Sequence, residues 1–378
     1  MITITKKNKR DVYDLTIEEN HNFYANNMLV HNCTEITLPT TPLQHIDDGD
    51  DTDSEIALCV LSAINVGEIK DLSDLESIMM NAVSSLDFVI EHQDYPVKAA
   101  EKMLKRRSIG IGITNLAYYL AKNNVNYDSP EALEVVDELM EHIQYYGIKA
   151  SVEMAKEFGK CEWFNRTKYS EGILPIDTYS KNVDNLVKRK PTLDWETLRK
   201  EVLEHGMRNS TITAIMPCES SSVVTNSTNG MEPLRSLITV KKSKQGLLKM
   251  VAPEILKLKN KYQLSYDLNG NTGISNIQAV IQKWIDQGIS ANHYYDFSKY
   301  NEGNLPMSEV AKDLLNFYKY GGKQLYYANT NDQKTDDFSQ VSTKSNNVEE
   351  QEQEQIKLKP GEVLLEGDDS CASGSCSI

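Results

Sequence analysis

The peptide bond between Asn32 and Cys33 divides this chain of 378 residues into two unlike parts. The side-chain amide of Asn32 can attack its own carbonyl carbon and so release the chain that follows it. His31 stands where an imidazole can protonate the departing amine, and Cys33 then offers a thiol at a new N-terminus. The junction therefore predicts a self-cleaving segment, residues 1–32, ahead of a separate domain.

The residues before this bond have the pattern of a small β structure. Residues 11–18 alternate as a strand does, and residues 21–30 give a turn and a second apolar strand. The block VYDLTIEENHNFYANNMLVHN, followed by Cys, resembles the C-terminal end of inteins. The resemblance implies a Hint-type β segment that mediates protein splicing. In it Asn32 cyclises, His21 and His31 assist the acid–base steps, and Cys33 is the nucleophile.

The composition narrows the class of protein. The net charge of −15 at pH 7 disfavours a nucleic acid as partner. No apolar run is long enough to span a bilayer, and the start of the chain lacks an apolar signal core. We therefore expect a cytoplasmic protein without a membrane partner. Six cysteines in this length do not indicate a disulfide framework, and redox or catalytic use is the better interpretation.

The chain divides into three parts. Residues 1–32 are the β segment, residues 33–330 have the pattern of a mixed α/β domain, and residues 331–378 form a polar tail whose composition predicts disorder. Apolar spacing predicts helices over 75–92, 130–158, 195–205, 247–260, 276–287 and 308–318. Within 247–260, Pro253 should kink the helix or start a new helix there. Short apolar runs predict buried strands over 109–113, 211–216 and 324–327, so the predicted fold class is α/β.

Three cysteine or carboxyl positions have both a plain and a chemical interpretation. Cys33 and Glu35 are two residues apart, so in an extended segment a thiol and a carboxylate face the same way. From the spacing alone, an exposed loop with an incidental Cys and Glu is the simpler interpretation. Cys59 lies in an apolar run, where a buried inert thiol is the ordinary expectation and pairing with another cysteine is the alternative.

A cluster of small polar residues follows the predicted strand over 211–216. Cys218, Glu219, Ser220 and Ser221 stand where a helix can begin, and the free N–H groups of a helix start favour anions. A plain helix cap is the alternative, and without other observations it is the better one.

Two residue pairs near the end of the chain carry reactive groups. Tyr326 and Tyr327 are adjacent, so their rings point to opposite faces of a regular strand and stack only if the backbone leaves that geometry. Core packing is the simpler interpretation of these two rings. Cys371 and Cys376 lie near the end of the tail, where a mobile thiol pair that exchanges with another disulfide explains their placement better than a structural bridge does.

Eight motifs, in order, are shared with one enzyme family. They are CTEITLPTTPL, SEIALCVLSAINVG, RRSIGIGITNLAYYLAK, WFNRTKYSEGILPIDTY, GMRNSTITAIMPCESSSVVTNSTNGMEP, IQKWIDQGISAN, LYYANT and DDSCASGSC. On these motifs, the chain from Cys33 to Ile378 resembles the C-terminal half of the large (α) subunit of class Ia ribonucleotide reductase, a ribonucleoside-diphosphate reductase. The implied fold is the second half of a ten-stranded α/β barrel, with Cys33 on a finger loop inside it.

The resemblance implies a role for each reactive residue. Cys33 resembles the thiyl-radical cysteine that abstracts the 3′ hydrogen of the ribose, and Glu35 the carboxylate that takes the 3′-hydroxyl proton. Cys59 resembles one of the two cysteines that reduce the 2′ position and become a disulfide. Tyr326 and Tyr327 resemble the phenols that carry the radical from the small subunit to the thiol.

The remaining matches concern the substrate and the reductant. Glu219, Ser220 and Ser221 match the loop that receives the substrate diphosphate, and Cys218 stands where the family usually has Ser. Cys371 and Cys376 resemble the tail pair that restores the active-site thiols and is itself reduced by thioredoxin or glutaredoxin.

The matched half lacks several parts of the whole enzyme. The other 2′-reducing cysteine and the nucleotide effector sites belong to the N-terminal half. The resemblance implies no metal or other cofactor in this chain, because the radical comes from the metal cofactor of the small (β) subunit. The expected partners are that subunit, thioredoxin or glutaredoxin, ribonucleoside diphosphates, and a polypeptide that carries the N-terminal half fused to an N-intein and joins this chain by trans-splicing.

Two other functions fit parts of the sequence. A class II reductase, which depends on adenosylcobalamin, shares the barrel, but Tyr326 and Tyr327 argue against it because that class needs no long radical path. A remnant that no longer splices and serves as a scaffold subunit is the second alternative. The intact residues His21, His31, Asn32 and Cys33 argue against it.

Overall fold

The computed structural model describes residues 34–42, 53–243 and 246–331, and the backbone of four short strands between residues 2 and 31. Strand β1 (Ile2–Lys7) pairs with β2 (Val12–Ile17), and β3 (Asn22–Ala25) pairs with β4 (Met28–His31), both antiparallel. The strand predicted over residues 11–18 is β2. The segment over 21–30 is a hairpin of two strands, where the sequence had indicated one strand after a turn.

Five extended segments run parallel and side by side through the middle of the domain. Strand β5 (Val60–Asn65) pairs with β6 (Ile109–Thr114), and β9 (Ala291–Asp296) pairs with β10 (Leu325–Asn331). Residues 211–216 lie between the two pairs, joined to each by a single parallel bridge. The strand predicted there is therefore an extended connection with two bridges. Helical crossovers separate the parallel segments along the chain, as expected for an α/β fold.

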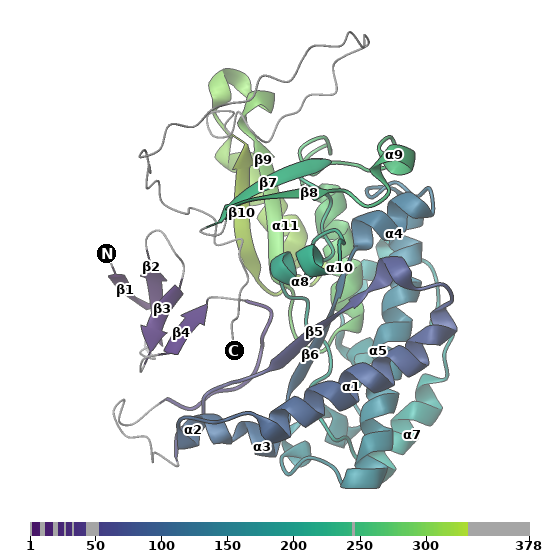
Figure 1. Ribbon diagram of the computed structural model, residues 1–378. Helices are drawn as coiled ribbons and strands as arrows, with labels where there is room; N and C mark the ends of the chain where they lie inside the picture. Colours follow the sequence, from purple (N-terminus) through teal and green to yellow (C-terminus); the bar gives the residue numbers. More distant parts are fainter. Residues whose placement is uncertain are drawn as a thin grey trace.

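Helices cover this parallel ladder (Figure 1). The longer ones are α1 (Leu75–His92), α5 (Pro130–Phe158), α7 (Trp195–His205), α10 (Thr272–Trp284) and α11 (Met307–Lys319). The shorter ones are α2 (Lys98–Glu101), α3 (Met103–Arg106), α4 (Leu116–Lys122), α6 (Pro175–Thr178), α8 (Glu219–Val224) and α9 (Ile255–Leu258). In the described part of the chain, no helix combines the length and apolar character that crossing a bilayer requires.

The bounds of the long helix α5 follow directly from its sequence. Ser129 accepts a hydrogen bond from the N–H of Ala132 at 3.3 Å, and Pro130 takes the first helical position. Gly159 follows the last turn with a φ of 81°, which a residue with a side chain rarely adopts. The predicted bounds of α1, α5 and α7 are confirmed. Helix α5 packs against α1, α7 and α10, and this contact forms the main core.

The prediction of a helix over residues 247–260 is wrong before Pro253, whereas the new helix expected near Pro253 is present. Residues Gly246–Val251 are strand β8, which pairs antiparallel with β7 (Ile238–Ser243). Helix α9 begins only at Ile255, after Pro253. A short apolar run fits both the helical period of 3.6 residues and the strand period of two. Here the pairing with β7 decides in favour of a strand. The helix predicted over 276–287 is α10, which begins at Thr272 and ends at Trp284.

A buried group of charged side chains joins α5 to α10. Asp137 is completely buried, and its carboxylate accepts hydrogen bonds from Lys283 Nζ at 2.7 Å and Trp284 Nε1 at 2.8 Å. Arg189 Nε donates to the same carboxylate at 2.9 Å. These donors replace the water that Asp137 loses on folding, so removal of the carboxylate would leave the buried Lys283 ammonium without its carboxylate partner.

The Asp137→Ala variant should therefore unfold far more easily than the wild type. We expect a loss of about 3–5 kcal/mol in the free energy of unfolding. The matched control is Glu138→Ala, the next residue of α5, whose side chain is exposed and whose removal should change stability by less than about 0.5 kcal/mol. Urea unfolding followed by circular dichroism measures both. Equal losses in the two variants would contradict this account of the cluster.

Candidate active site

The segment directly after Cys33 is held by residues that precede β9 and β10. The Thr34 N–H donates to Ser290 Oγ at 3.2 Å, and the Gly288 N–H donates to the Glu35 carbonyl at 2.8 Å. The side-chain amide of Gln324 donates to the Thr34 carbonyl. Thr34 and Glu35 are therefore fixed against the parallel ladder by side-chain and backbone contacts at once.

Glu35 is a buried carboxyl with one oxygen left to accept a proton or a hydrogen bond. Its side chain has no exposed surface, so the interpretation of this residue as part of an exposed loop is wrong. Ser290 Oγ donates to Oε2, and Oε1 has no hydrogen-bond partner among the described residues. Burial raises the pKa of Glu35, although the hydrogen bond from Ser290 acts in the opposite direction. A carboxyl in this state is suited to take a proton from a ligand.

Cys59 lies just before β5, with its sulfur directed into the protein. Gln287 Nε2 is 3.6 Å from Sγ, and a Cβ on Gly110 would lie 3.2 Å from the same sulfur. Burial raises the pKa of the Cys59 thiol, and the nearby carboxyls of Asp286 and Glu35 add to this effect. The thiol is therefore protonated at neutral pH. Gln287 contacts Cys59 and the next residue contacts Glu35, so the structure brings these two predicted site residues together.

The residues predicted to bind phosphate lie at the start of α8. Cys218 occupies the N-cap position without a side-chain capping bond, and its Sγ lies 3.6 Å from the carbonyl oxygens of Ile113 and Met216. Burial raises the pKa of this thiol to about 12. Ser221 Oγ donates back to the Cys218 carbonyl at 3.2 Å. Glu219 and Ser220 are half-buried in the first turn.

The rings of the two adjacent tyrosines of β10 are in contact, in a tilted arrangement. The ring centroids of Tyr326 and Tyr327 are 4.0 Å apart, with an interplanar angle of 49°. The pairing of β10 with β9 shifts register between Leu325 and Ala328, which is the departure from regular strand geometry that such a pair requires. Both rings are half-buried, and the Tyr327 N–H donates to Asn292 Oδ1 at 3.1 Å.

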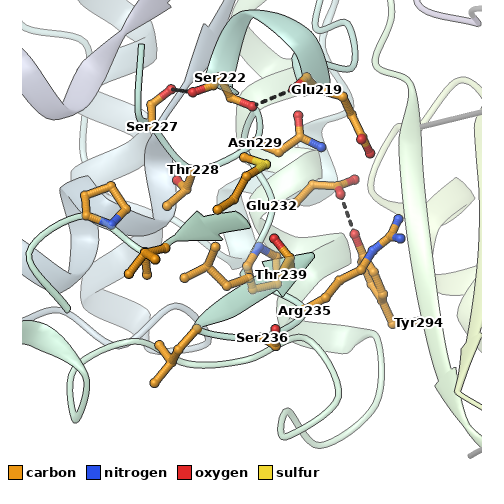
Figure 2. A pocket seen from close by; sticks show the side chains of 17 residues that line it. Glu219, Ser222, Ser227, Thr228, Asn229, Glu232, Arg235, Ser236, Thr239 and Tyr294 are labelled. Atoms are coloured by element: carbon orange, nitrogen blue, oxygen red, sulfur yellow. Dashed lines mark hydrogen bonds between the residues drawn. The ribbon is translucent and has the colours of Figure 1, made fainter. Parts of the chain in front are cut away.

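A cavity of about 140 Å³ lies between α8 and the β7–β8 hairpin (Figure 2). Glu219 belongs to its wall, whereas Cys218, Ser220 and Ser221 do not. The buried carboxyl of Glu232 also lines it and accepts hydrogen bonds from Tyr294 and Asn292. Burial raises the pKa of Glu232. Asn292 therefore links the cavity wall to the backbone of the tyrosine pair.

Several residues that build this site carry no local signal in the sequence. They are Glu232, Gln287, Ser290, Asn292 and Gln324. Gln287, Ser290 and Asn292 belong to the motif IQKWIDQGISAN, in which polar residues interrupt an apolar run. Buried amides and hydroxyls at such positions are the only sign that their side chains have partners elsewhere.

Other predicted site residues lie outside the described part of the chain. They are His21, Asn32, Cys33, Cys371 and Cys376. His31 ends strand β4, and the structure describes its backbone alone. Their predicted roles stay predictions.

The chain belongs to the ribonucleotide reductase family, whose barrel domain matches residues 12–328. The match begins inside the segment for which the sequence predicts splicing. The chain is 47% identical over 347 residues to the "Ribonucleoside-diphosphate reductase subunit alpha" of Haemophilus influenzae, which covers 92% of this chain and 42% of that protein. It is 44% identical over 290 residues to "Ribonucleoside-diphosphate reductase 1 subunit alpha" of Escherichia coli. These aligned residues are 76% of this chain and 35% of that protein.

A viral protein is also similar to this chain. The "Ribonucleoside-diphosphate reductase subunit alpha" of Enterobacteria phage T4 is 41% identical over 311 residues, which are 81% of this chain and 40% of that protein. The chain thus spans less than half the length of these curated relatives. The comparisons confirm the predicted family. The intein segment and the division of the enzyme into two halves stay predictions.

The Glu35→Gln variant tests the state of the buried carboxyl. Because the folded protein holds the Glu35 proton more tightly than the unfolded chain does, the wild type loses stability as pH rises from the ordinary carboxyl pKa, near 4.5, through the raised one. Gln does not titrate, so the variant should be the more stable protein at neutral pH, and its advantage should vanish below pH 4.5. Urea unfolding across this pH range measures the difference. A variant less stable than wild type at neutral pH would contradict the assignment.

Proposed function

We propose that this chain is the C-terminal part of a ribonucleoside-diphosphate reductase, active after it joins a polypeptide with the N-terminal half. The observation that carries the proposal is the placement of Glu35. A buried carboxyl follows Cys33 by two residues, and one of its oxygens has no hydrogen-bond partner among the described residues. Gln287 and Gly288 bring this carboxyl beside the thiol of Cys59.

The proposed reaction divides its steps among these groups. A thiyl radical on Cys33 removes the 3′ hydrogen atom of the ribose, and Glu35 takes the 3′-hydroxyl proton at Oε1. The 2′-hydroxyl then leaves as water. Cys59 and a cysteine of the N-terminal half supply two electrons and two protons, one to the departing water and one to C2′, and become a disulfide. Cys33 then returns the hydrogen atom to C3′, which restores the thiyl radical, and Glu35 returns the proton to the 3′ oxygen. A protonated Cys59 suits this role, because a thiol supplies its proton together with its electron.

Radical transfer from a small subunit is the proposed role of the tyrosine pair. Two tilted phenol rings with centroids 4.0 Å apart, just after the residue that holds Thr34, support a path toward Cys33. Helix α11, which leads into β10, exposes an apolar stripe: Met307, Leu315 and Tyr318 are 77%, 68% and 79% exposed. We propose that the small subunit, whose metal cofactor supplies the radical, docks on this stripe.

The substrate and the reductant complete the proposal. Glu219, Ser220 and Ser221 would receive the diphosphate at the start of α8. The Cys218 thiol faces two backbone carbonyls, so a weak donor stands where the family has a hydroxyl. Cys371 and Cys376 would reduce the active-site disulfide and pass the electrons on from thioredoxin or glutaredoxin. Nucleotide effectors would bind the N-terminal half.

Reconstitution tests this function. The chain is mixed with the N-terminal half fused to an N-intein, a small subunit, a ribonucleoside diphosphate and thioredoxin as the only reductant. Deoxyribonucleoside diphosphate should form over many turnovers. The chain without the N-terminal half is the control and should form none, because half of the barrel and one reducing cysteine are absent. A spliced product without turnover, or turnover by this chain alone, would refute the proposal.

Removal of either phenol oxygen should abolish turnover by the reconstituted enzyme. Tyr326→Phe and Tyr327→Phe keep the contact between the two rings but lack the O–H whose proton must leave when the ring is oxidised at neutral pH. We expect losses of about a thousandfold or more, equal to about 4 kcal/mol in barrier height, with substrate binding unchanged. Tyr119→Phe, on α4, is the control. Near-normal turnover in both variants would return the pair to a packing role.

We further propose that residues 1–32 are removed by splicing, with Asn32 as the cyclising residue. The Asn32→Ala variant lacks the side-chain amide, so mixing it with the N-intein fusion should release no 32-residue segment, whereas wild type should release it. His31→Ala and His21→Ala should slow release by about a hundredfold or more, through loss of acid–base assistance. Mass spectrometry of the products decides. Release of the segment by Asn32→Ala would exclude this mechanism.

A further inference from the structure

Gln287 occupies a rigid position between α10 and β9. Its side chain has no exposed surface. Its backbone N–H donates to the Thr213 carbonyl at 3.2 Å, and its own carbonyl accepts from Gln282 Nε2 at 3.0 Å and Lys323 Nζ at 2.5 Å. The backbone of Gln287 therefore has little freedom, and the direction of its side chain is set by its surroundings.

The hydrogen bonds of the Gln287 side chain fix which end of the amide faces Cys59. Nε2 lies 3.0 Å from the carbonyl oxygen of Ile109 and 3.6 Å from Cys59 Sγ. The opposite orientation would place Oε1 against a carbonyl oxygen, where two acceptors repel each other. The amide must therefore present an N–H group to the sulfur. It does so although Oε1 is left buried without a hydrogen-bond partner in the described part of the chain.

The other surroundings of Cys59 Sγ disfavour a negative charge. Gly110 closes one side of the sulfur, and Cys59 is half-buried. The carboxyls of Asp286 and Glu35 lie near enough to repel a thiolate. The thiol can donate weakly to the Val60 carbonyl at 3.9 Å. Within the described residues, Gln287 is the one hydrogen-bond donor directed at this sulfur, so a thiolate on Cys59 depends on it.

We propose that Gln287 is a positioning residue for Cys59, which orients the sulfur and stabilises its thiolate during thiol–disulfide exchange. The importance of that exchange rests on the proposed function. When the thiolate of an incoming dithiol attacks the partner sulfur of a disulfide that includes Cys59, the S–S bond breaks and its electron pair goes to Cys59. The Gln287 N–H stabilises this leaving thiolate until it takes a proton, and a stabilised leaving group departs faster.

Alkylation of the full chain with iodoacetamide tests the inference without any reductase activity. The rate at Cys59 follows the fraction of thiolate, and site-resolved mass spectrometry gives that rate from about pH 7 to pH 10. In the Gln287→Leu variant we expect Cys59 to react about three to ten times more slowly across this range, with its pH profile displaced to higher pH. Cys161 is the internal reference, since it is buried and distant from Gln287 in the sequence.

Gln278→Leu is the matched control. Gln278 lies in α10 and, like Gln287, is buried. Its side-chain amide donates to the Asn292 carbonyl at 3.1 Å and has no sulfur partner among the described residues. Its loss should leave the Cys59 profile unchanged. An unchanged profile in Gln287→Leu, or an equal displacement in Gln278→Leu, would overturn the proposal. Because no turnover is measured, either result is independent of the proposed function.

A second measurement covers the case in which Gln287→Leu does not fold. In protein labelled with ¹⁵N-glutamine, the side-chain N–H resonances of Gln287 should move when Cys59 is replaced in the Cys59→Ala variant, because the hydrogen bond to sulfur is lost. Those of Gln278 should not move. Stationary Gln287 resonances would show that its amide does not bond to the sulfur, and the inference would fall.

Discussion

The two hydrogen bonds of Ser290 with Thr34 and Glu35 hold the candidate site together. One hydroxyl accepts from the Thr34 N–H and donates to the Glu35 carboxyl, across 256 and 255 residues of sequence. Its own backbone N–H donates to the Ile215 carbonyl at 2.9 Å, within the parallel ladder. The position of the buried carboxyl is therefore as rigid as the ladder itself. Without this donor, the buried Glu35 carboxyl would lose its one side-chain hydrogen bond within the described residues.

Buried acids give the site its chemical character. Burial raises the pKa values of Glu35, Glu232 and Asp286, and the charges of nearby carboxyls raise those of Cys59 and Cys218 further. The thiols therefore keep their protons at neutral pH. Hydrogen-atom chemistry needs neutral S–H groups, whereas disulfide exchange needs thiolates. The proposed function assigns both to one site, and the proposed role of Gln287 is to stabilise the anion when disulfide exchange forms it.

The sequence predicts local structure well and long-range contacts poorly. The bounds of α1, α5 and α7 follow from apolar period and caps, because both signals lie within the helix. Residues 246–251 form a strand because β7 pairs with them, which the apolar run alone does not reveal. The family resemblance gave Glu35 and Cys59. It gave no role to Ser290, Gln287 or Gln324, since each acts on a residue more than 200 positions away.

The burial of the parallel strands indicates where an N-terminal half of the domain could pair with this chain. Every residue of the inner strand β6 is buried, whereas β5 and β10, at the two ends of the ladder, are mostly half-buried or exposed. Within the described residues, each of these outer strands pairs on one side alone. Parallel sheets are normally covered on both faces, and an open edge can pair with another strand.

Both outer strands carry site residues at or next to their starts: Cys59 precedes β5, and Tyr326 and Tyr327 lie in β10. Strands from an N-terminal half, added at these edges, would close the ladder into a barrel and enclose the thiol, the carboxyl and the phenols together. Under the proposed function, the same closure would also exclude water from a radical intermediate, so covered edges and a dry interior would have one origin.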